Sequence, residues 1–142
     1  MTDQSSEPTV APWLTRHAHW VLRASLASVF LFHGIDKFLG TGIAGFAQVM
    51  DLPLIIALLV ALGELAAGIF ILLGGVVAGL TGAVITRLGA TGMIVILLGA
   101  IFVAHWGQWH FMSTPTHPMG GMQFQVTLAL MAAYMLIKGN RA

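Results

Sequence analysis

Glu64 is the one charged residue within a long apolar segment that runs from Leu52 to Leu73. A helix of about 20 apolar residues, rising about 1.5 Å per residue, crosses the hydrocarbon core of a bilayer. A carboxylate near the middle of such a helix costs roughly 2.5–3.5 kcal/mol on insertion scales. Such groups are usually paired or used chemically. Glu64 is therefore the first candidate functional residue, and a structural pair with a group on another helix is the alternative.

Four further titratable groups are placed where they can join Glu64. In an expected first helix, His33 lies three residues before Asp36 and four before Lys37, so the three share one helical face. His105 ends another apolar segment. Side chains of these types can exchange protons, and we expect His33, Asp36, Glu64 and His105 to converge on one outward-facing cavity. The alternatives are a helix-to-helix hydrogen bond for His33, an interfacial position for His105 and a solvated helix end for Asp36 and Lys37.

The composition is that of a membrane protein. Of the 142 residues, 58% are hydrophobic and 8% are charged, against about a quarter charged in soluble domains. The net charge of +1, without a basic run, gives no sign of nucleic-acid binding. Cysteine is absent, which excludes disulfides, thiolate metal sites and covalently attached c-type haem. A redox role would therefore need a bound cofactor or a quinone, with no covalent cofactor.

The apolar segments predict an all-α fold, an integral membrane antiparallel four-helix bundle. The expected spans are residues 20–39, 53–74, 88–104 and 124–137, the last extended back to 121 or 122. Residues 1–15 are polar and contain proline, so we expect a disordered tail rather than a signal peptide. Residues 16–142 would then form a single membrane domain, embedded in the lipid bilayer.

Residues 75–86 are apolar and rich in glycine, and they either lengthen the third span or lie as extra turns at the interface. The depth of Arg87 depends on this segment. A tight hairpin at Gly74–Gly75 would bring Glu64 and Arg87 to one depth as an ion pair. Alternatively, residues 75–86 lie at the cytoplasmic surface and Arg87 is an anchor there. We favour the second arrangement, because it leaves residues 88–105 as one ordinary span of about 27 Å.

The basic residues predict the orientation of the chain. With a cytoplasmic N-terminus, all but one of them fall on the cytoplasmic side: Arg16, Arg23, Arg87, Lys138 and Arg141. Only Lys37 falls on the other side. Since cytoplasmic flanks of membrane helices are enriched in Lys and Arg, we expect both termini in the cytoplasm and a multi-pass protein of the bacterial inner membrane. The candidate residues then lie in the outer half of the bundle.

Several segments together resemble the DoxX family of small four-span membrane proteins. They are RASLASVFLFHGIDKF at 23–38, GELAAG at 63–68, RLGA at 87–90 and AIFVAHW at 100–106. Each is loose alone, but their order and spacing over residues 20–140 are more specific. The stretch between Glu64 and Arg87 is longer than in the family pattern. The resemblance implies the four-span fold and a link to membrane redox systems, since the family is named for a subunit of a thiosulfate:quinone oxidoreductase.

From this resemblance we expect a subunit or accessory of a quinone-linked oxidoreductase, acting with a partner redox subunit or as a homo-oligomer. Whether the chain is itself catalytic stays open. The quinone site would be formed by His33, Asp36, Lys37, Glu64, Arg87, His105 and Trp106. Within it, His33, Glu64 and His105 would exchange protons, and Lys37 or Arg87 would stabilise an anionic form of the quinone.

Two other classes of function are compatible with the residues. In a scaffold or assembly factor, the polar groups would only specify helix packing. In a metal or haem protein, His33 and His105 would be axial ligands of a b-type haem, or four residues would bind copper: His105, His110, His117 and Met119. Their spacing is not that of a standard metal site, so we predict no metal.

Overall fold

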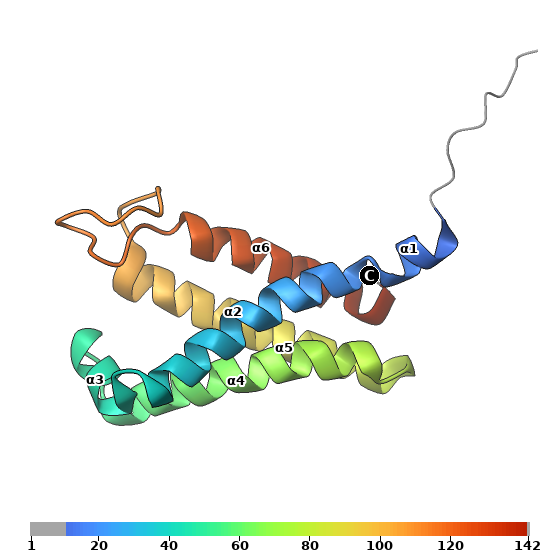
Figure 1. Cartoon of the computed structure of the whole chain (residues 1–142), viewed down its shortest axis with the longest axis horizontal. Coiled ribbons are helices and arrows are strands. Elements are labelled where there is room, and N and C mark those ends of the chain that lie inside the picture. Colours follow the sequence, from blue (N-terminus) through green and yellow to red (C-terminus); the bar gives the residue numbers. More distant parts are fainter. Residues whose placement is uncertain (1–10, 142) are drawn as a thin grey trace, which may run out of the picture.

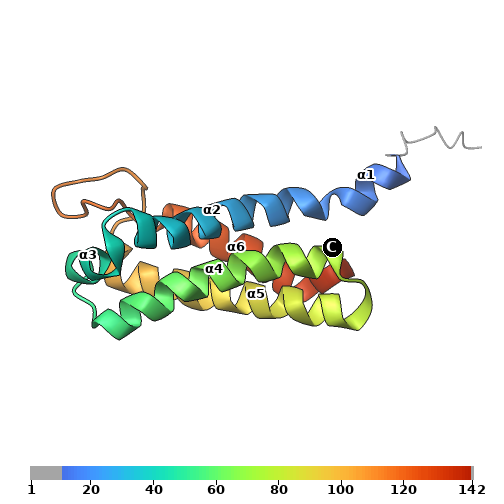
Figure 2. The same cartoon turned by 60° about the horizontal axis from the view of Figure 1, so that its bottom comes forward.

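The computed structural model describes residues 11–141, and every regular element in this range is helical. The helices are α1 (Pro12–His17), α2 (His19–Leu39), α3 (Gly42–Val49), α4 (Leu54–Val76), α5 (Gly79–Ala100) and α6 (Gln123–Lys138). A π-helical turn, Ile101–His105, continues α5, and a 3-10 turn, Gly139–Arg141, follows α6. The all-α prediction is confirmed for the described residues. Figures 1 and 2 show α2, α4, α5 and α6 lying along one another in alternating directions.

Two helices in the described range are long and apolar enough to cross a membrane. They are Leu54–Val76, with a mean hydropathy of 2.6, and Gly79–His105, with a mean hydropathy of 2.1. α6 is apolar but has only 16 residues, and the 21 residues of α2 include Arg23, Asp36 and Lys37. The membrane character of the chain therefore comes chiefly from the α4–α5 hairpin.

The core lies between the four long helices. It includes Leu26 and Phe30 of α2, Ile71 of α4, Met93 and Leu97 of α5, and Leu128 and Met135 of α6. α4 packs on α2 and on α5, and α5 packs on α6. A Cβ atom on Gly34 of α2 would lie 2.7 Å from the Leu65 side chain of α4, so this close approach requires glycine. By contrast, the backbones of α2 and α6 come close at few positions, and these two helices meet chiefly through core side chains such as Phe30 and Leu128.

The connection between α4 and α5 differs from the sequence-based expectation. α4 continues to Val76, and α5 begins at Gly79, whose φ of 71° suits a tight turn. Residues 75–86 are therefore almost entirely helical and do not form the surface segment that we favoured. Inside a bilayer, backbone N–H and C=O groups have no water to bond to, and a helix provides each with a partner within the same segment. This explains why both helices continue up to a short turn.

Two smaller elements were not expected. α3 is a short helix between the first two long ones. α1 begins at Pro12, where a proline is tolerated because the first helical N–H has no partner. α1 thus includes the last residues of the tail expected at 1–15, and residues 1–10 of that tail lie outside the described range.

The two ends of the molecule are formed by different segments (Figures 1 and 2). α1 and the Gly139–Arg141 turn lie at one end, which we call the terminal end. α3 and the 106–122 loop lie at the other, which we call the loop end. The expected outer-half residues belong to the loop end.

Candidate functional site

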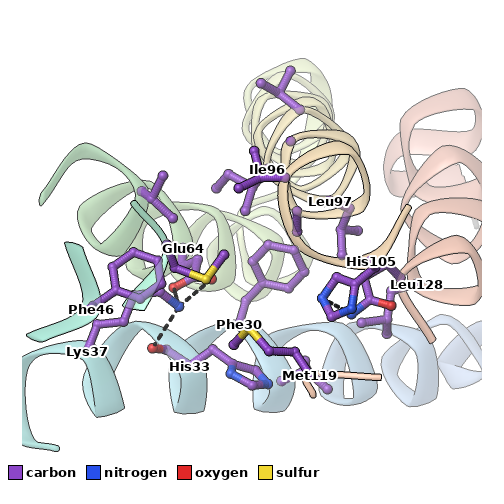
Figure 3. A pocket seen from close by; sticks show the side chains of 18 of the residues that line it. Phe30, His33, Lys37, Phe46, Glu64, Ile96, Leu97, His105, Met119 and Leu128 are labelled. Atoms are coloured by element: carbon purple, nitrogen blue, oxygen red, sulfur yellow. Dashed lines mark hydrogen bonds and ion pairs between the residues drawn. The ribbon is translucent and has the colours of Figure 1, made fainter. Parts of the chain in front are cut away.

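A cavity of about 650 Å³ lies at the loop end, between α2, α3, α4, α5 and α6. Most of its lining is apolar: Val29, Phe30, Phe46, Met50, Leu52, Ile56, Val60, Val95, Ile96, Leu97, Gly99, Ala100, Val103, Met119, Phe124 and Leu128. The polar side chains are His33, Lys37, Glu64, His105 and Gln125. Figure 3 shows Lys37 and Glu64 on one side of Phe30 and His105 on the other. The cavity is thus apolar with two separate polar groups.

The first polar group is an ion pair between α2 and α4. Lys37 Nζ donates to Glu64 Oε1 at 2.9 Å and makes an ionic contact with Oε2 at 2.7 Å (dashed in Figure 3). The same ammonium lies 4.6 Å from the centre of the Phe46 ring on α3, a cation–π distance. The side chains of Lys37 and Glu64 are 12% and 11% exposed. The pair is therefore largely shielded, yet it borders the cavity.

This pair explains how Glu64 is accommodated in an apolar helix. The partner is Lys37 and not Arg87, the partner considered for a hairpin at Gly74–Gly75. Because the turn lies further along, at residues 77–78, Arg87 sits nearer the terminal end than Glu64 does. Arg87 Nε donates instead to the Leu136 carbonyl at 3.2 Å. A buried ion pair recovers its desolvation cost only with good geometry. Here Oε1 accepts a hydrogen bond from Lys37 at 2.9 Å, whereas Oε2 has the ionic contact at 2.7 Å but accepts no hydrogen bond from the described residues.

The second polar group is built around His105. This residue ends the π-helical turn Ile101–His105, and such turns often occur at functional sites. The ring is buried. Its Nδ1 lies 2.9 Å from the Gly120 carbonyl oxygen, and its Nε2 lies 2.8 Å from Gln125 Nε2 of α6. Both ring nitrogens are therefore hydrogen-bonded, which fixes the orientation of the imidazole.

The remaining predicted residues are distributed unequally. His33 lines the cavity from an exposed position on α2. Asp36 is exposed and does not line the cavity. Trp106 is 61% exposed and stacks on Phe102, with ring centres 5.1 Å apart, outside the cavity. Arg87 lies about 12 Å along α5 from Val95, the first cavity residue of that helix.

The structure thus brings His33, Lys37, Glu64 and His105 to one cavity and leaves Asp36, Arg87 and Trp106 outside it. Sequence reasoning missed Gln125, although a polar side chain inside the apolar segment 124–137 is a usable signal.

The loop histidines are held in separate hydrogen bonds. His117 Nε2 lies 2.8 Å from the Trp106 carbonyl oxygen, and His110 Nδ1 lies 3.4 Å from Gln108 Nε2. Among residues 11–141, no three His, Asp or Glu side chains are grouped in a way that could hold a metal ion. The copper arrangement considered from the sequence is therefore not formed in the described part of the chain.

At the terminal end, Arg23 of α2 is fully buried. Its Nη1 donates to the Ile71 carbonyl and, at 3.0 Å, to Thr86 Oγ1, while Nη2 donates to Asn140 Oδ1 at 2.9 Å. Its Nε donates to His19 Nδ1 at 3.0 Å. This network joins α2, α4, α5 and the C-terminal turn.

Long apolar helices, a shielded ion pair between α2 and α4 and a mainly apolar cavity are the features of a small helical membrane protein. The chain matches the DoxX family over residues 18–106. This covers more than half of the sequence, so the chain belongs to the DoxX family. Comparison with curated proteins and with solved structures gave no match.

Proposed function

We propose that this DoxX family protein binds a quinone in the loop-end cavity and acts as a subunit or accessory of a membrane oxidoreductase. The cavity itself is the observation that carries the proposal. Small-molecule sites typically enclose about 300–1,000 Å³ and combine an apolar lining with few polar groups. The cavity has about 650 Å³ and the polar side chains of Lys37, Glu64, His33, His105 and Gln125.

The residues present fit a quinone head group. Its ring is apolar and its oxygens need hydrogen-bonding partners, which matches a mainly aliphatic and aromatic cavity with two polar groups. Val95 and Val103 line the cavity and are 64% and 54% exposed, so an isoprenoid tail can leave the cavity along α5 toward lipid. When bound, a quinone takes up two electrons and two protons, with the electrons delivered by a partner redox subunit.

The chain's own residues supply binding and proton handling. Lys37 brings a positive charge to the cavity wall, and Glu64 balances that charge at 2.7 Å. His33 is exposed and lines the same cavity, so its ring nitrogens can pass a proton between solvent and the site. His105 is fixed by two hydrogen bonds and serves to orient Gln125.

The proposal places the protein in the bacterial inner membrane with both termini in the cytoplasm. α1 and the Gly139–Arg141 turn share one end (Figure 1), and Arg23, Arg87 and Lys138 lie toward that end, as the positive-inside rule favours. A Ser113→Cys variant is expected to react with an impermeant maleimide from the outside of intact cells. Labelling only after permeabilisation would mean that residue 113 faces the cytoplasm and that the proposed orientation is wrong.

Quinone binding is tested on protein purified in lipid nanodiscs. We expect an organic extract to contain quinone, and added short-chain ubiquinone or menaquinone to bind saturably, measured by calorimetry. Gly99 lines the cavity, and a Cβ atom placed on it has no neighbour within 4 Å. Gly99→Phe should therefore fill the cavity without backbone strain and weaken binding by more than tenfold.

The adjacent Leu98 is the matched control, since it is 45% exposed and lies outside the cavity lining. Leu98→Phe should leave quinone affinity within about twofold. No saturable binding by the wild type, or equal effects of the two substitutions, would contradict the proposal.

A scaffold role is the second candidate, and the polar networks favour it. The Lys37–Glu64 pair joins α2 to α4, and Arg23 joins three helices to the C-terminal turn. Under this alternative, substituting Glu64 lowers stability but no quinone binds. The same nanodisc titration separates the two functions.

A further inference from the structure

Gln125 has a side-chain oxygen that the protein leaves without a partner. Gln125 Oε1 is buried and accepts no hydrogen bond from any residue within 11–141. Gln125 also lines the loop-end cavity. Buried acceptors without a donor are uncommon and destabilising, so this oxygen calls for an explanation.

The neighbouring histidine fixes which end of the amide is free. The Gly120 carbonyl can only accept, so the 2.9 Å contact requires that His105 Nδ1 carries the hydrogen. In the neutral ring, His105 Nε2 is then an acceptor. It receives a hydrogen from Gln125 Nε2 at 2.8 Å. The Gln125 amide group is therefore held by its NH₂, and its buried oxygen is left as an acceptor without a donor among the described residues, on a side chain that lines the cavity.

We propose that Gln125 Oε1 is a specificity-determining acceptor that favours the reduced, hydroxyl-bearing form of the ligand. This inference rests on the proposed function of the cavity as a quinone site. A quinol hydroxyl can donate to Gln125 Oε1, whereas a quinone carbonyl would face it as a second acceptor. A site that hydrogen-bonds a ligand hydroxyl discriminates against the analogue that lacks it. The His105–Gln125 pair thus sets the redox preference of the site, while Lys37 and Glu64 lie at its other polar group.

The experiment compares three probes in nanodiscs under anaerobic conditions: a short-chain ubiquinone, its quinol, and the dimethyl ether of that quinol. Calorimetry gives the dissociation constant of each. For the wild type, the dimethyl ether should bind about tenfold more weakly than the quinol, because it has no hydroxyl hydrogen to donate. Gln125→Met, a substitution of similar length and shape, should weaken quinol binding about tenfold and change the other two by less than twofold.

Gln123→Met is the control, because Gln123 lies on the same helix and does not line the loop-end cavity. It should leave all three affinities unchanged. A dimethyl ether penalty that persists in Gln125→Met would be steric and would overturn the assignment. A greater loss for quinone than for quinol would mean that Gln125 presents its NH₂ group, which also overturns it.

The outcomes also separate the inference from the proposed function. If quinone and quinol both bind but Gln125→Met weakens them equally, the inference fails and the quinone site stands. If neither binds the wild type, both fail. Should Gln125→Met not fold, the quinol and dimethyl ether comparison on the wild type still decides, since equal binding of the two overturns the assignment.

Discussion

α2 carries two shielded cations about four turns apart, and the two ends of the molecule treat them differently. At the terminal end, Arg23 is completely buried and donates to carbonyl, hydroxyl, amide and imidazole acceptors. At the loop end, Lys37 pairs with the carboxylate of Glu64 beside a cavity. One cation is held by neutral groups in a packed region, and the other is neutralised next to open space.

With the proposed function, this difference divides α2 between structure at one end and ligand binding at the other. The guanidinium group is planar and has five N–H donors, so it can join several elements at once. Lysine is a compact charge that one carboxylate neutralises. The terminal end therefore fixes the helices and the C-terminal turn, while the loop end keeps a cavity with a charge at its wall. We expect substitutions at the terminal end to affect stability most, and those at the loop end to affect stability and ligand binding together.

The largest effect is expected from Arg23→Lys. Lysine keeps the charge but cannot reach Ile71, Thr86 and Asn140 at once. Each lost hydrogen bond to a charged group costs about 1.5–3 kcal/mol, so we expect a loss of about 5 kcal/mol. The measurement is the free energy of unfolding in mild detergent, with quinone affinity determined on the fraction that remains folded.

The reciprocal substitution, Lys37→Arg, is the control for this prediction. It keeps a cation opposite Glu64, so it should cost about 1 kcal/mol, within the range of volume changes at packed sites. If the two swaps had equal effects, the contrast between the ends would be wrong.

The fold could be predicted well from the sequence where apolar segments are long. α2 and α4 lie close to the expected spans 20–39 and 53–74. α5 begins at residue 79 rather than at 88, which agrees with the alternative in which residues 75–86 lengthen the third span and not with the surface segment that we favoured. An apolar, glycine-rich segment such as residues 75–86 can form either a surface segment or a helix, and the packing against neighbouring helices determines which of the two forms. Gly74 shows this, since a Cβ atom there would lie 2.7 Å from the Thr86 backbone nitrogen.

The site could be predicted only in part, because pairing depends on helix rotation. Glu64 was recognised as a residue that could pair with another helix. Arg87 was its partner only in the disfavoured hairpin arrangement, and the structure gives Lys37. Phe46 could not be foreseen, because it lies on the unexpected helix α3. A polar residue within an apolar span, as at Gln125, was the one missed signal that the sequence contained.

An intermediate effect is expected from a double-mutant cycle on the ion pair. Removing one partner of a buried pair leaves an uncompensated charge and costs about 3–5 kcal/mol. Because both side chains retain about a tenth of their exposure, we expect about 3 kcal/mol for Glu64→Leu and for Lys37→Met. The double variant should recover most of this loss. Unfolding free energies of the four proteins in detergent give the coupling energy.

The partner assignment has its own control. Arg87→Met combined with Glu64→Leu should show no recovery, because Arg87 hydrogen-bonds Leu136 and not Glu64. If stability recovers in the double variant of Arg87 and Glu64 but not in that of Lys37 and Glu64, the partner of Glu64 is Arg87, as in the hairpin arrangement. If the stability losses are additive in both double variants, Glu64 is coupled to neither cation and the ion pair does not stabilise the loop end.

The smallest effect is expected at Phe46, whose ring centre lies 4.6 Å from Lys37 Nζ. Replacing the ring by a similar apolar side chain in Phe46→Leu removes a cation–π contact worth about 0.5–2 kcal/mol. We expect a stability loss near 1 kcal/mol, and a loss near zero when the substitution is made in Lys37→Met. Phe46 also lines the cavity, so Phe46→Leu should change quinone affinity as well. A change in stability alone would show that α3 stabilises the ion pair without touching the ligand, and the loop end would then resemble the terminal end more closely than we propose.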